Sequence, residues 1–408
     1  MEAHTFLLQL LVILVAARVC GEVVASLGAP SVIGELLAGI LIGPSLLGWV
    51  APSELLRVLA EVGVILLLFE VGLETDMGRL LGSARKSVTV AMGGFVAPLL
   101  VGYAVSHYLF GQSQLVSLFV GGTLTATSIG ITVRVLVDVH RQNSPEGQIT
   151  LGAAVLDDLM GVVLLAVLYE FSVTGEVNWL NAARVVAYIS LFFLIAPVLA
   201  KLMSRVIGVL DQRIDNPGLI PVTIVSLVLF FAWSAHLFGA PELLGGFAAG
   251  LALSRRFFLP FGLAVSTDTD FAHRVESQMK PIVQLFTPIF FVMVGLSLDL
   301  REVDWSSWFF WSFSLVLVVV AICTKFTGAL LINEPFPRRF VVGMAMVPRG
   351  EVGLIFAGLG SAAGVFAGET YTALVMVIAY TTLLSPFWIK LYYRRVLPLL
   401  ERAEAGAR

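Results

Sequence analysis

Residues 34–43 read GELLAGILIG, and residues 241–250 read PELLGGFAAG. Each stretch places Glu-Leu-Leu ahead of two glycines that lie four residues apart. A second pair of similar stretches follows in the same order, with FEVGLETD at 69–76 and VMVGLSLD at 292–299. Glycines at this spacing also mark close helix contacts in general. Two matched blocks in the same order nevertheless indicate an internal repeat.

The composition of the chain is that of a membrane protein. Its 408 residues are 58% hydrophobic and only 13% charged, whereas a soluble domain carries about 25% charged residues. Apolar runs recur at about 20 residues, the length of a membrane-spanning helix. Lipid permits only helices and closed barrels, and the short alternating strands of a barrel are absent from the sequence pattern. We therefore expect an all-α polytopic membrane protein.

Run lengths and breaks predict about 13 transmembrane helices. Their approximate ranges are 4–27, 31–50, 54–75, 87–110, 115–138, 149–172, 181–208, 217–238, 241–254, 280–299, 305–332, 340–364 and 371–393.

The repeat blocks fall in spans two and nine and in spans three and ten. Seven spans separate the members of each pair, so the two copies are expected to cross the membrane in opposite directions. Such an inverted-topology repeat is typical of secondary transporters.

Basic residues test the span count independently, because cytoplasmic loops are rich in Lys and Arg. Every basic cluster follows an odd-numbered span, and Arg301 is the clear exception. The N-terminus is therefore expected outside and the C-terminus in the cytoplasm. The first span is expected to be retained, since MEAHTF lacks the basic start of a signal peptide. The clusters are Arg79, Arg85 and Lys86; Arg141; Lys201, Arg205 and Arg213; Arg255, Arg256, Arg274 and Lys280; Arg338 and Arg339; and Arg394, Arg395, Arg402 and Arg408.

Two spans carry interruptions at corresponding places. The 223-residue shift that relates Gly72 to Gly295 carries Thr125, in GGTLTATSIGIT, to Pro348, in AMVPRGEVGLI. Pro348 would interrupt a helical ladder, and the hydroxyls of Thr127 and Ser128 could bind freed backbone groups. Discontinuous helices at matching positions of two repeats point to a substrate site.

Two neighbouring acids, Asp157 and Asp158, lie in the apolar stretch LGAAVLDDLMGVVLLAV at 151–167. Intramembrane acids are costly and are functional by default. At 1.5 Å per residue they lie about 12 Å from the cytoplasmic end of their span, as does Lys325 in AICTKFTGALL. Adjacent helical residues point about 100° apart, so one acid can face Lys325 while the other faces the broken span.

A dry carboxylate beside hydroxyl and carbonyl oxygens suits a small hard cation. Removal from water also raises the proton affinity of a carboxylate, so protons and cations would compete for one group. Two acids facing one lysine leave an excess negative charge that a proton or cation would neutralise. Arg349 and Glu351 flank the second break and are expected to stabilise exposed helix ends. A buried ion-pair network that only stabilises the fold is the alternative.

At these residues the chain resembles the cation:proton antiporter-2 family of monovalent cation/proton antiporters, and within it the NapA-like antiporters. The matching elements cover nearly the whole chain. They are VIGELLAGILIGPSLLG, LLLFEVGLE, ATSIGITVRVL, GAAVLDDLMG, the lysine of CTKFTGALL, and VPRGEVGLI.

The resemblance implies a homodimer in the cell (inner) membrane that needs no cofactor and exchanges Na⁺ or Li⁺ for protons. It implies two crossed broken helices, a scaffold domain (1–75 and 217–299), an ion-translocating core (86–172 and 305–397) and a linker helix (181–208). Carried over by motif, Asp158 binds the cation and protons in turn, and Asp157 pairs with Lys325. Thr127 and Ser128 border the ion site, with Thr125, Arg349 and Glu351 in support, and electrogenic transport is implied.

Other functions stay open from the residues alone. A K⁺/H⁺ antiporter of the Kef-like branch differs only in its ion. A cation channel would need a continuous pore and filter elements, which the sequence does not indicate. An aspartyl intramembrane protease needs one acid on each of two helices, whereas these acids are neighbours. Nothing in the composition or the net charge of −3 indicates a nucleic-acid partner.

Overall fold

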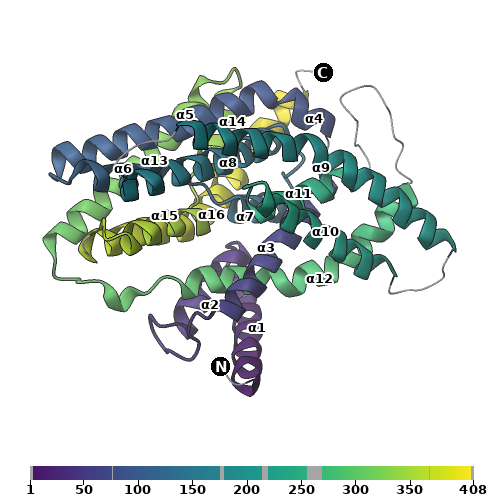
Figure 1. The fold of residues 1–408 in the computed structure, drawn as a ribbon, viewed down its shortest axis with the longest axis horizontal. Helices are drawn as coiled ribbons and strands as arrows, with labels where there is room; N and C mark the ends of the chain where they lie inside the picture. The colour runs from purple at the N-terminus through teal and green to yellow at the C-terminus, as the bar shows by residue number, and fades with distance from the viewer. Residues whose placement is uncertain are drawn as a thin grey trace. The chain divides into compact units, whose positions relative to one another are not determined.

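The computed structural model describes residues 3–75, 77–174, 179–213, 219–254, 269–366 and 368–405. The regular structure of these residues is helical, without a strand, as the sequence predicts (Figure 1). Asp76, Arg255, Arg256 and Arg408, which enter the repeat and charge arguments, lie outside the described residues.

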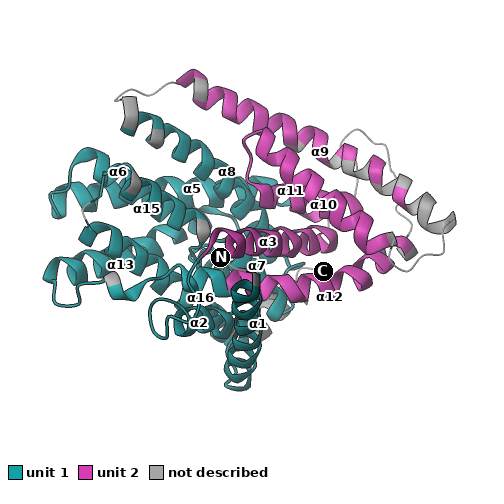
Figure 2. Ribbon diagram, turned by 60° about the horizontal axis from the view of Figure 1, so that its bottom comes forward, with its two compact units in different colours: residues 1–52, 83–178, 292–408 teal, residues 53–82, 179–291 magenta. Residues whose placement is uncertain are grey.

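The chain packs as two compact units, coloured separately in Figure 2. Unit 1 comprises residues 1–52, 83–178 and 292–408, and unit 2 comprises residues 53–82 and 179–291. These units are defined by which segments pack together. The scaffold and core predicted from the sequence are defined instead by which part moves during transport, and the division into scaffold and core stays a prediction.

Most helices belong to unit 1. They are α1 (Ala3–Ser26), α2 (Ser31–Ile42), α5 (Ala84–Ala104), α6 (Gln114–Thr125), α7 (Ile129–Asp138), α8 (Pro145–Thr174), α13 (Trp308–Leu331), α14 (Phe336–Ala345), α15 (Glu351–Ala362) and α16 (Gly368–Ala405). A π-helical turn, Val105–Leu109, follows α5, and a 3₁₀ turn, Leu300–Glu302, precedes α13.

Unit 2 contains α3 (Glu54–Glu74), α4 (Met77–Gly82), α9 (Trp179–Arg213), α10 (Leu219–Leu237), α11 (Glu242–Leu253) and most of α12 (Thr269–Leu296). Within it, α3 packs against α11, and α11 also contacts α9 and α10.

Within unit 1, α5 packs against α13, α6 and α8. Backbones approach closely where glycines meet: a Cβ on Gly93 would lie 2.5 Å from the Cα of Gly328. Phenylalanines from α6, α13 and α15 fill a core beside these helices, including Phe119, Phe313 and Phe356. This packing holds α6, α8 and α13 together, and these helices carry the predicted site residues.

The glycine blocks of the repeat form two helix crossings, one in each unit. In unit 1 a Cβ on Gly39 of α2 would lie 2.1 Å from the carbonyl oxygen of Val292, and one on Gly295 of α12 would lie 2.2 Å from that of Leu36. In unit 2 a Cβ on Gly72 of α3 would lie 3.2 Å from the carbonyl carbon of Gly250 in α11. Each crossing pairs a helix of one repeat copy with a helix of the other.

The largest differences from the run-length prediction are at three helix bounds. α2 ends at Ile42 rather than 50, because Gly43 and Pro44 follow it. α12 begins at Thr269 rather than 280, and α16 extends to Ala405 rather than 393. Run length detects only the apolar part of a helix, and the polar ends of α12 and α16 continue beyond it.

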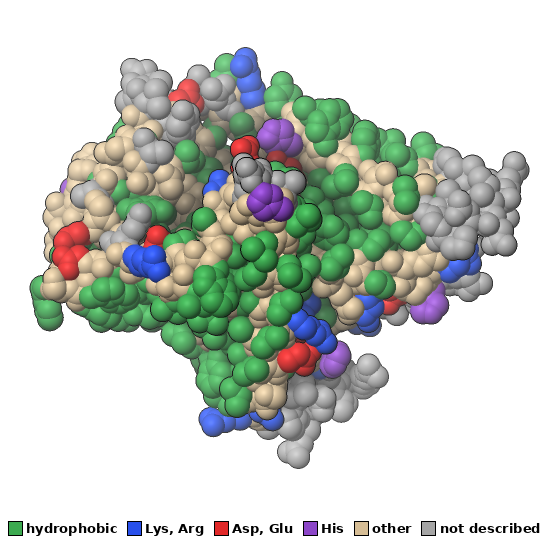
Figure 3. All heavy atoms as spheres, turned by 90° about the horizontal axis from the view of Figure 1, so that it is seen from below, with side chains coloured by type: hydrophobic (Ala, Val, Ile, Leu, Met, Phe, Trp, Pro, Cys, Tyr) green, Lys and Arg blue, Asp and Glu red, His purple; other side chains and the backbone are tan. Residues whose placement is uncertain are grey.

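Eight stretches of the described residues are long and apolar enough to cross a membrane, and four shorter apolar helices accompany them. On the face drawn in Figure 3, hydrophobic side chains cover broad areas and charged side chains gather in small groups. Such a surface suits lipid rather than water.

Candidate ion site at two broken helices

The first broken helix consists of α6 and α7. Residues Ala126–Ser128 between them are not helical, and Ala126 adopts φ −57° and ψ 137°. Ser128 caps α7 by accepting a hydrogen bond from the amide of Ile131 at 3.4 Å. Serine and threonine bind backbone groups outside a helix readily, and this favours an interruption here.

The second broken helix consists of α14 and α15, with Met346–Gly350 between them. Pro348 has no amide to donate to a helical ladder. Gly350 lies against the first break, because a Cβ there would lie 2.6 Å from Ser128 Oγ and 2.8 Å from Ser128 Cβ. The predicted interruptions are therefore present, and the two breaks lie in contact.

Hydrogen bonds join the two breaks directly. The amide of Ser128 donates to the carbonyl of Pro348 at 2.8 Å, and Thr127 Oγ1 donates to that of Met346 at 3.2 Å. Thr132 Oγ1, in the first turn of α7, donates to the carbonyl of Ala345 at 2.7 Å. Carbonyls that α14 cannot use internally thus find donors on the other broken helix.

Two fully buried cationic side chains donate hydrogen bonds to carbonyls at the C-terminal end of α6. Lys325 Nζ donates to the carbonyl of Thr125 at 2.5 Å, and Arg349 Nη1 donates to that of Ala126 at 2.6 Å. Arg349 Nη2 also donates to the carbonyl of Ala321 in α13 at 3.3 Å. A helix C-terminus carries about half a negative charge, so both cations lie where the α6 dipole stabilises them.

The two neighbouring acids lie on α8 and are buried, with Asp157 1% and Asp158 3% exposed. Lys325 Nζ lies 3.1 Å from Asp157 Oδ2, and neither side chain of this pair is exposed. Asp157 Oδ1 is buried and has no hydrogen-bond partner. One acid therefore pairs with Lys325 and retains an acceptor oxygen beside the breaks.

The charge count predicted from the sequence requires one correction. The sequence predicts two acids facing one lysine, but Arg349 is also fully buried, so the formal charges of the four side chains balance. The hydrogen bonds of Arg349 run to carbonyls, and about half a charge of the α6 terminus offsets the two cations. The excess negative charge expected from two acids and one lysine is therefore not present in this set of four side chains.

The side chains of the other predicted residues, Thr125 and Glu351, make no described contact with the two acids or with Lys325. The side chain of Thr125 donates to Gly122 of its own helix at 2.7 Å, and only its carbonyl reaches Lys325. Glu351 is the first residue of α15, and its side chain lies outside the described part of the structure. Among the described residues no group of three or more His, Cys, Asp and Glu could hold a metal ion, so any cation at Asp158 would rely on hydroxyl and carbonyl oxygens as well.

Two threonines at this site were not predicted. Thr132 bridges the broken helices, and Thr382 Oγ1 of α16 donates to the carbonyl of Arg349 at 2.5 Å. Thr132 stands four residues after the predicted Ser128, and this spacing, which places both on one helix face, could have indicated it. Thr382 lies in an ordinary apolar span and gives no such signal.

A second ionic cluster, also not predicted, lies in unit 1 beside the first turn of α14. Glu334 accepts from Lys86 at 2.6 Å and from Arg338 at 2.5 Å. Glu146 of α8 lies 2.8 Å from Arg141 and 3.4 Å from Arg338. Burial would raise the pKa of Glu334, but the hydrogen bonds from Lys86 and Arg338 outweigh it and hold the pKa below its ordinary value. This cluster ties α5 and α8 to the start of α14.

Comparison with known proteins identifies the family. The sequence profile described as "Sodium/hydrogen exchanger, transmembrane" matches residues 10–395. The chain belongs to the sodium/hydrogen exchanger family. This confirms the monovalent cation/proton antiporter predicted from the motifs, and with it a multi-pass membrane protein whose function is sodium/proton antiport.

Curated relatives match over most of their length. The Na⁺/H⁺-K⁺ antiporter GerN of Bacillus cereus is 36% identical over 396 residues, which cover 94% of this chain and 95% of GerN. The high-affinity Na⁺/H⁺ antiporter NhaS3 of Synechocystis sp. is 32% identical over 326 residues, 79% of this chain and 68% of NhaS3. A Na⁺/H⁺ antiporter of Enterococcus hirae is 30% identical over 392 residues, 95% of this chain and 98% of that protein.

Solved structures of another exchanger share the fold. The sodium proton antiporter MjNhaP1 of Methanocaldococcus jannaschii superposes with a TM-score of 0.75 at 18% identity, covering 98% of each chain. A structure of the same antiporter at pH 8 gives a TM-score of 0.68 at 15% identity. At these identities the likeness establishes the fold alone.

Proposed function

We propose that the chain exchanges Na⁺ or Li⁺ for protons by alternating access, with Asp158 as the group that binds the cation and protons in turn. The observation that carries this proposal is the buried Asp157–Lys325 pair at 3.1 Å, adjacent in the chain to a second buried acid and bonded to the first broken helix. Thr127, Ser128 and nearby carbonyls would supply further oxygen ligands to a hard cation.

Two protons leave the protein for each cation in this proposal. When the site faces the cytoplasm, Asp158 releases a proton and binds a cation. The added positive charge weakens the attraction that keeps Lys325 protonated beside Asp157, so Lys325 releases the second proton. Exchange of two protons for one monovalent cation moves net charge, and transport is therefore electrogenic.

The architecture proposed for this cycle is an elevator-like homodimer in which each chain has about 13 transmembrane helices, with its N-terminus outside and its C-terminus in the cytoplasm. The core (86–172 and 305–397) would move against the scaffold (1–75 and 217–299), with residues 181–208 as the linker. Paired crossings of the two repeat copies support the inverted repeat, because Gly39 meets Gly295 as Gly72 meets Gly250. Transporters of this kind alternate access by moving one part against another around a midplane site.

Potassium is a second candidate substrate. The printed name of GerN, the relative 36% identical to this chain, includes K⁺ beside Na⁺. A site built mainly of hydroxyl and carbonyl oxygens with one carboxylate discriminates between the two ions by the spacing of those oxygens. The transport assay therefore compares Na⁺, Li⁺ and K⁺.

The test is cation-driven proton movement in proteoliposomes, measured as dissipation of a pH gradient and, in parallel, as current on a charged sensor surface. Wild-type protein is expected to respond to Na⁺ in both assays. Asp158→Asn is expected to respond in neither, whereas Asp304→Asn, which changes an exposed acid, retains both. Full cation-dependent proton exchange by Asp158→Asn would overturn the proposal.

A further inference from the structure

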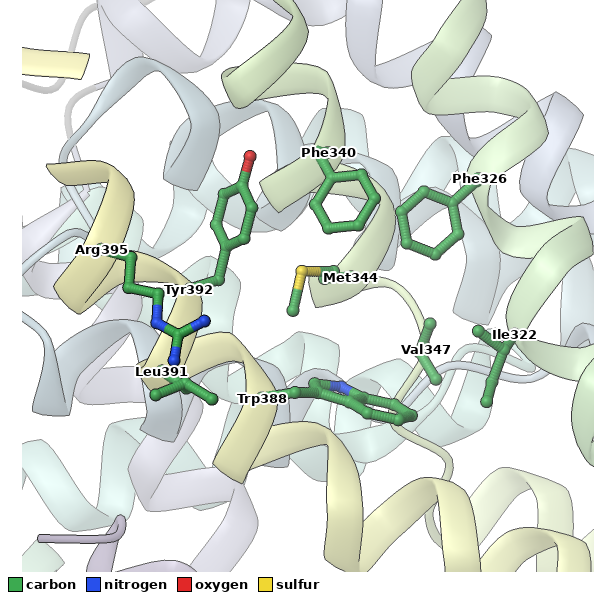
Figure 4. A pocket seen from close by; sticks show the side chains of 9 residues that line it. All are labelled: Ile322, Phe326, Phe340, Met344, Val347, Trp388, Leu391, Tyr392 and Arg395. Atoms are coloured by element: carbon green, nitrogen blue, oxygen red, sulfur yellow. The ribbon is translucent and has the colours of Figure 1, made fainter. Parts of the chain in front are cut away.

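A cavity of about 330 Å³ lies in unit 1 between α13, α14 and α16. Phe326 and Phe340 form part of its wall, with ring centroids 5.0 Å apart, and Met344 lies at its centre in the close view (Figure 4). Its volume is at the lower end of the range for small-molecule sites, about 300–1,000 Å³. One lining residue, Val347, lies within the second break, but none of the side chains proposed to bind the ion lines the cavity.

The lining is apolar at one end and cationic at the other. On α16 the lining residues are Trp388, Leu391, Tyr392 and Arg395. Their spacing of three, four and seven residues places them on one helix face. Arg395 is exposed, while Val347 at the opposite side is only 1% exposed. The cavity is therefore amphipathic along its length.

Trp388 leaves one hydrogen-bond donor unused in this cavity. Its indole nitrogen is buried and has no hydrogen-bond partner, and Figure 4 shows this nitrogen on the edge of the ring that borders the open space. The hydroxyl of Tyr392, by contrast, is directed to the carbonyl of Pro337 at 3.4 Å. A ligand that reaches Trp388 would thus gain from carrying a hydrogen-bond acceptor.

The surface around the cavity is that of a lipid-facing helix face. On α16, Leu384 is 48%, Phe387 53% and Leu391 38% exposed, and on α13, Val319 is 60% and Leu330 46% exposed. α13 and α16 both carry stretches apolar and long enough to span the membrane. The mouth therefore opens to hydrocarbon, and Arg394 and Arg395 mark the level at which headgroups begin.

We propose that this cavity binds one anionic phospholipid, with an acyl chain against Met344 and Val347 and the phosphate on Arg395. An acyl chain matches the apolar lining and the surrounding lipid-facing surface, and an ester or phosphate oxygen accepts from the indole of Trp388. The positive charge of Arg395 selects an anionic headgroup. The bound chain lies against α14 and against Val347, the residue before Pro348 of the second break.

The experiment measures quenching of Trp388 fluorescence by brominated lipids in bilayers of the full chain. The signal of Trp388 is the difference between wild type and Trp388→Phe, since the chain has seven tryptophans. Brominated phosphatidylglycerol is expected to give half-maximal quenching at about a fivefold lower mole fraction than brominated phosphatidylcholine, the factor expected for one basic residue near an anionic lipid.

Matched variants assign the preference to one residue. Arg395→Gln is expected to make the two lipids quench equally, and Arg395→Lys to restore most of the preference. Arg394→Gln changes the neighbouring charge, which lies outside this cavity, and leaves the preference intact. Native mass spectrometry is expected to show one phosphatidylglycerol retained by wild type and lost by Arg395→Gln. Equal quenching of the wild type by both lipids, or the same loss in Arg394→Gln, would overturn the proposal.

Discussion

The two broken helices occupy matching positions of the repeat, but their breaks offer opposite chemistry. The first break, Ala126–Ser128, offers carbonyls and hydroxyls, and the carbonyls of Thr125 and Ala126 accept from Lys325 and Arg349. The second break supplies the cation itself, because Arg349 lies within it. Proline and glycine interrupt the second helix, whereas small polar residues interrupt the first.

The repeat determines where the helix ends lie, but it does not determine which side chains lie beside them. Repeat symmetry places two helix ends of each sign in one region of unit 1. The side chains at each break differ, so a protein cation binds the end of α6. In the proposed cycle another part of the site binds the transported cation. In the proposed cycle Arg349 is a resident positive charge that compensates the α6 terminus, and Asp158 is the group that exchanges its proton for a cation.

The largest effect is expected from Arg349→Met, which removes the cation of the second break. It leaves the carbonyls of Ala126 and Ala321 without this donor in a dry interior, and it leaves two buried acids with only one buried lysine. An uncompensated buried charge costs about 3–5 kcal/mol. Thermal unfolding in detergent measures this loss. Arg339→Met is the matched control, since Arg339 also donates to two carbonyls, those of Glu334 and Leu330, but is not fully buried. Equal losses for both variants would show that the burial of Arg349 is irrelevant.

Gly350→Ala is expected to destabilise the protein by about 1–3 kcal/mol, as overpacking does, because the new Cβ would lie within 2.6–2.8 Å of Ser128. Transport should fall with stability, since the contact joins the two breaks. The double variant Gly350→Ala with Ser128→Gly also removes the Ser128 side chain that the new Cβ would meet. It should recover part of the lost stability. No recovery in the unfolding temperature would mean that the two breaks do not press on each other here.

Thr132→Val removes the hydroxyl that donates a hydrogen bond to the carbonyl of Ala345 at 2.7 Å. A buried hydrogen bond contributes about 1 kcal/mol, so a small fall in unfolding temperature with unchanged cation selectivity is expected. Thr123→Val is a suitable control, because its hydroxyl donates to Phe119 within its own helix. A larger loss for Thr123→Val would contradict the importance of hydrogen bonds between the breaks.

The smallest effect is expected at Glu334, outside the breaks. Hydrogen bonds from Lys86 and Arg338 keep its folded-state pKa below the ordinary value of 4.5, against the opposing effect of burial. The stabilisation is therefore present above pH 4.5 and is lost as the pH falls through the lower folded-state pKa. Unfolding temperatures of wild type and Glu334→Gln from pH 6 downward should converge in that acidic range. Parallel curves would contradict this sign.

Much of the fold could be predicted from the sequence because its determinants are local. Pro348 and the polar run at Thr125–Ser128 interrupt helices wherever they fold, and both interruptions lie where the repeat shift placed them. Run length failed at α12 and α16, because polar residues continue a helix that apolar counting has already ended. The ends of these helices depend on their surroundings rather than on hydropathy.

The site was predictable only in part. Lys325 and Asp157 could be matched through equal depth, since rise per residue alone gives depth. The partners of Arg349 could not, because the carbonyls of Ala126 and Ala321 belong to segments 223 and 28 residues away, and a backbone acceptor leaves no trace in residue type. Thr382 could not be predicted for the same reason, because it also donates to a backbone carbonyl. The sequence likewise predicts one buried cation at the site, whereas the structure has two.

The most direct test of the central claim is the number of protons released when Na⁺ binds to the purified protein. Calorimetric titrations with Na⁺ in buffers of different ionisation enthalpy give that number. Wild type is expected to release protons on binding, Lys325→Met to release fewer, and Asp158→Asn to show no binding heat. Na⁺ binding whose heat is the same in every buffer, or binding that survives in Asp158→Asn, would contradict competition between sodium and protons at this pair of acids.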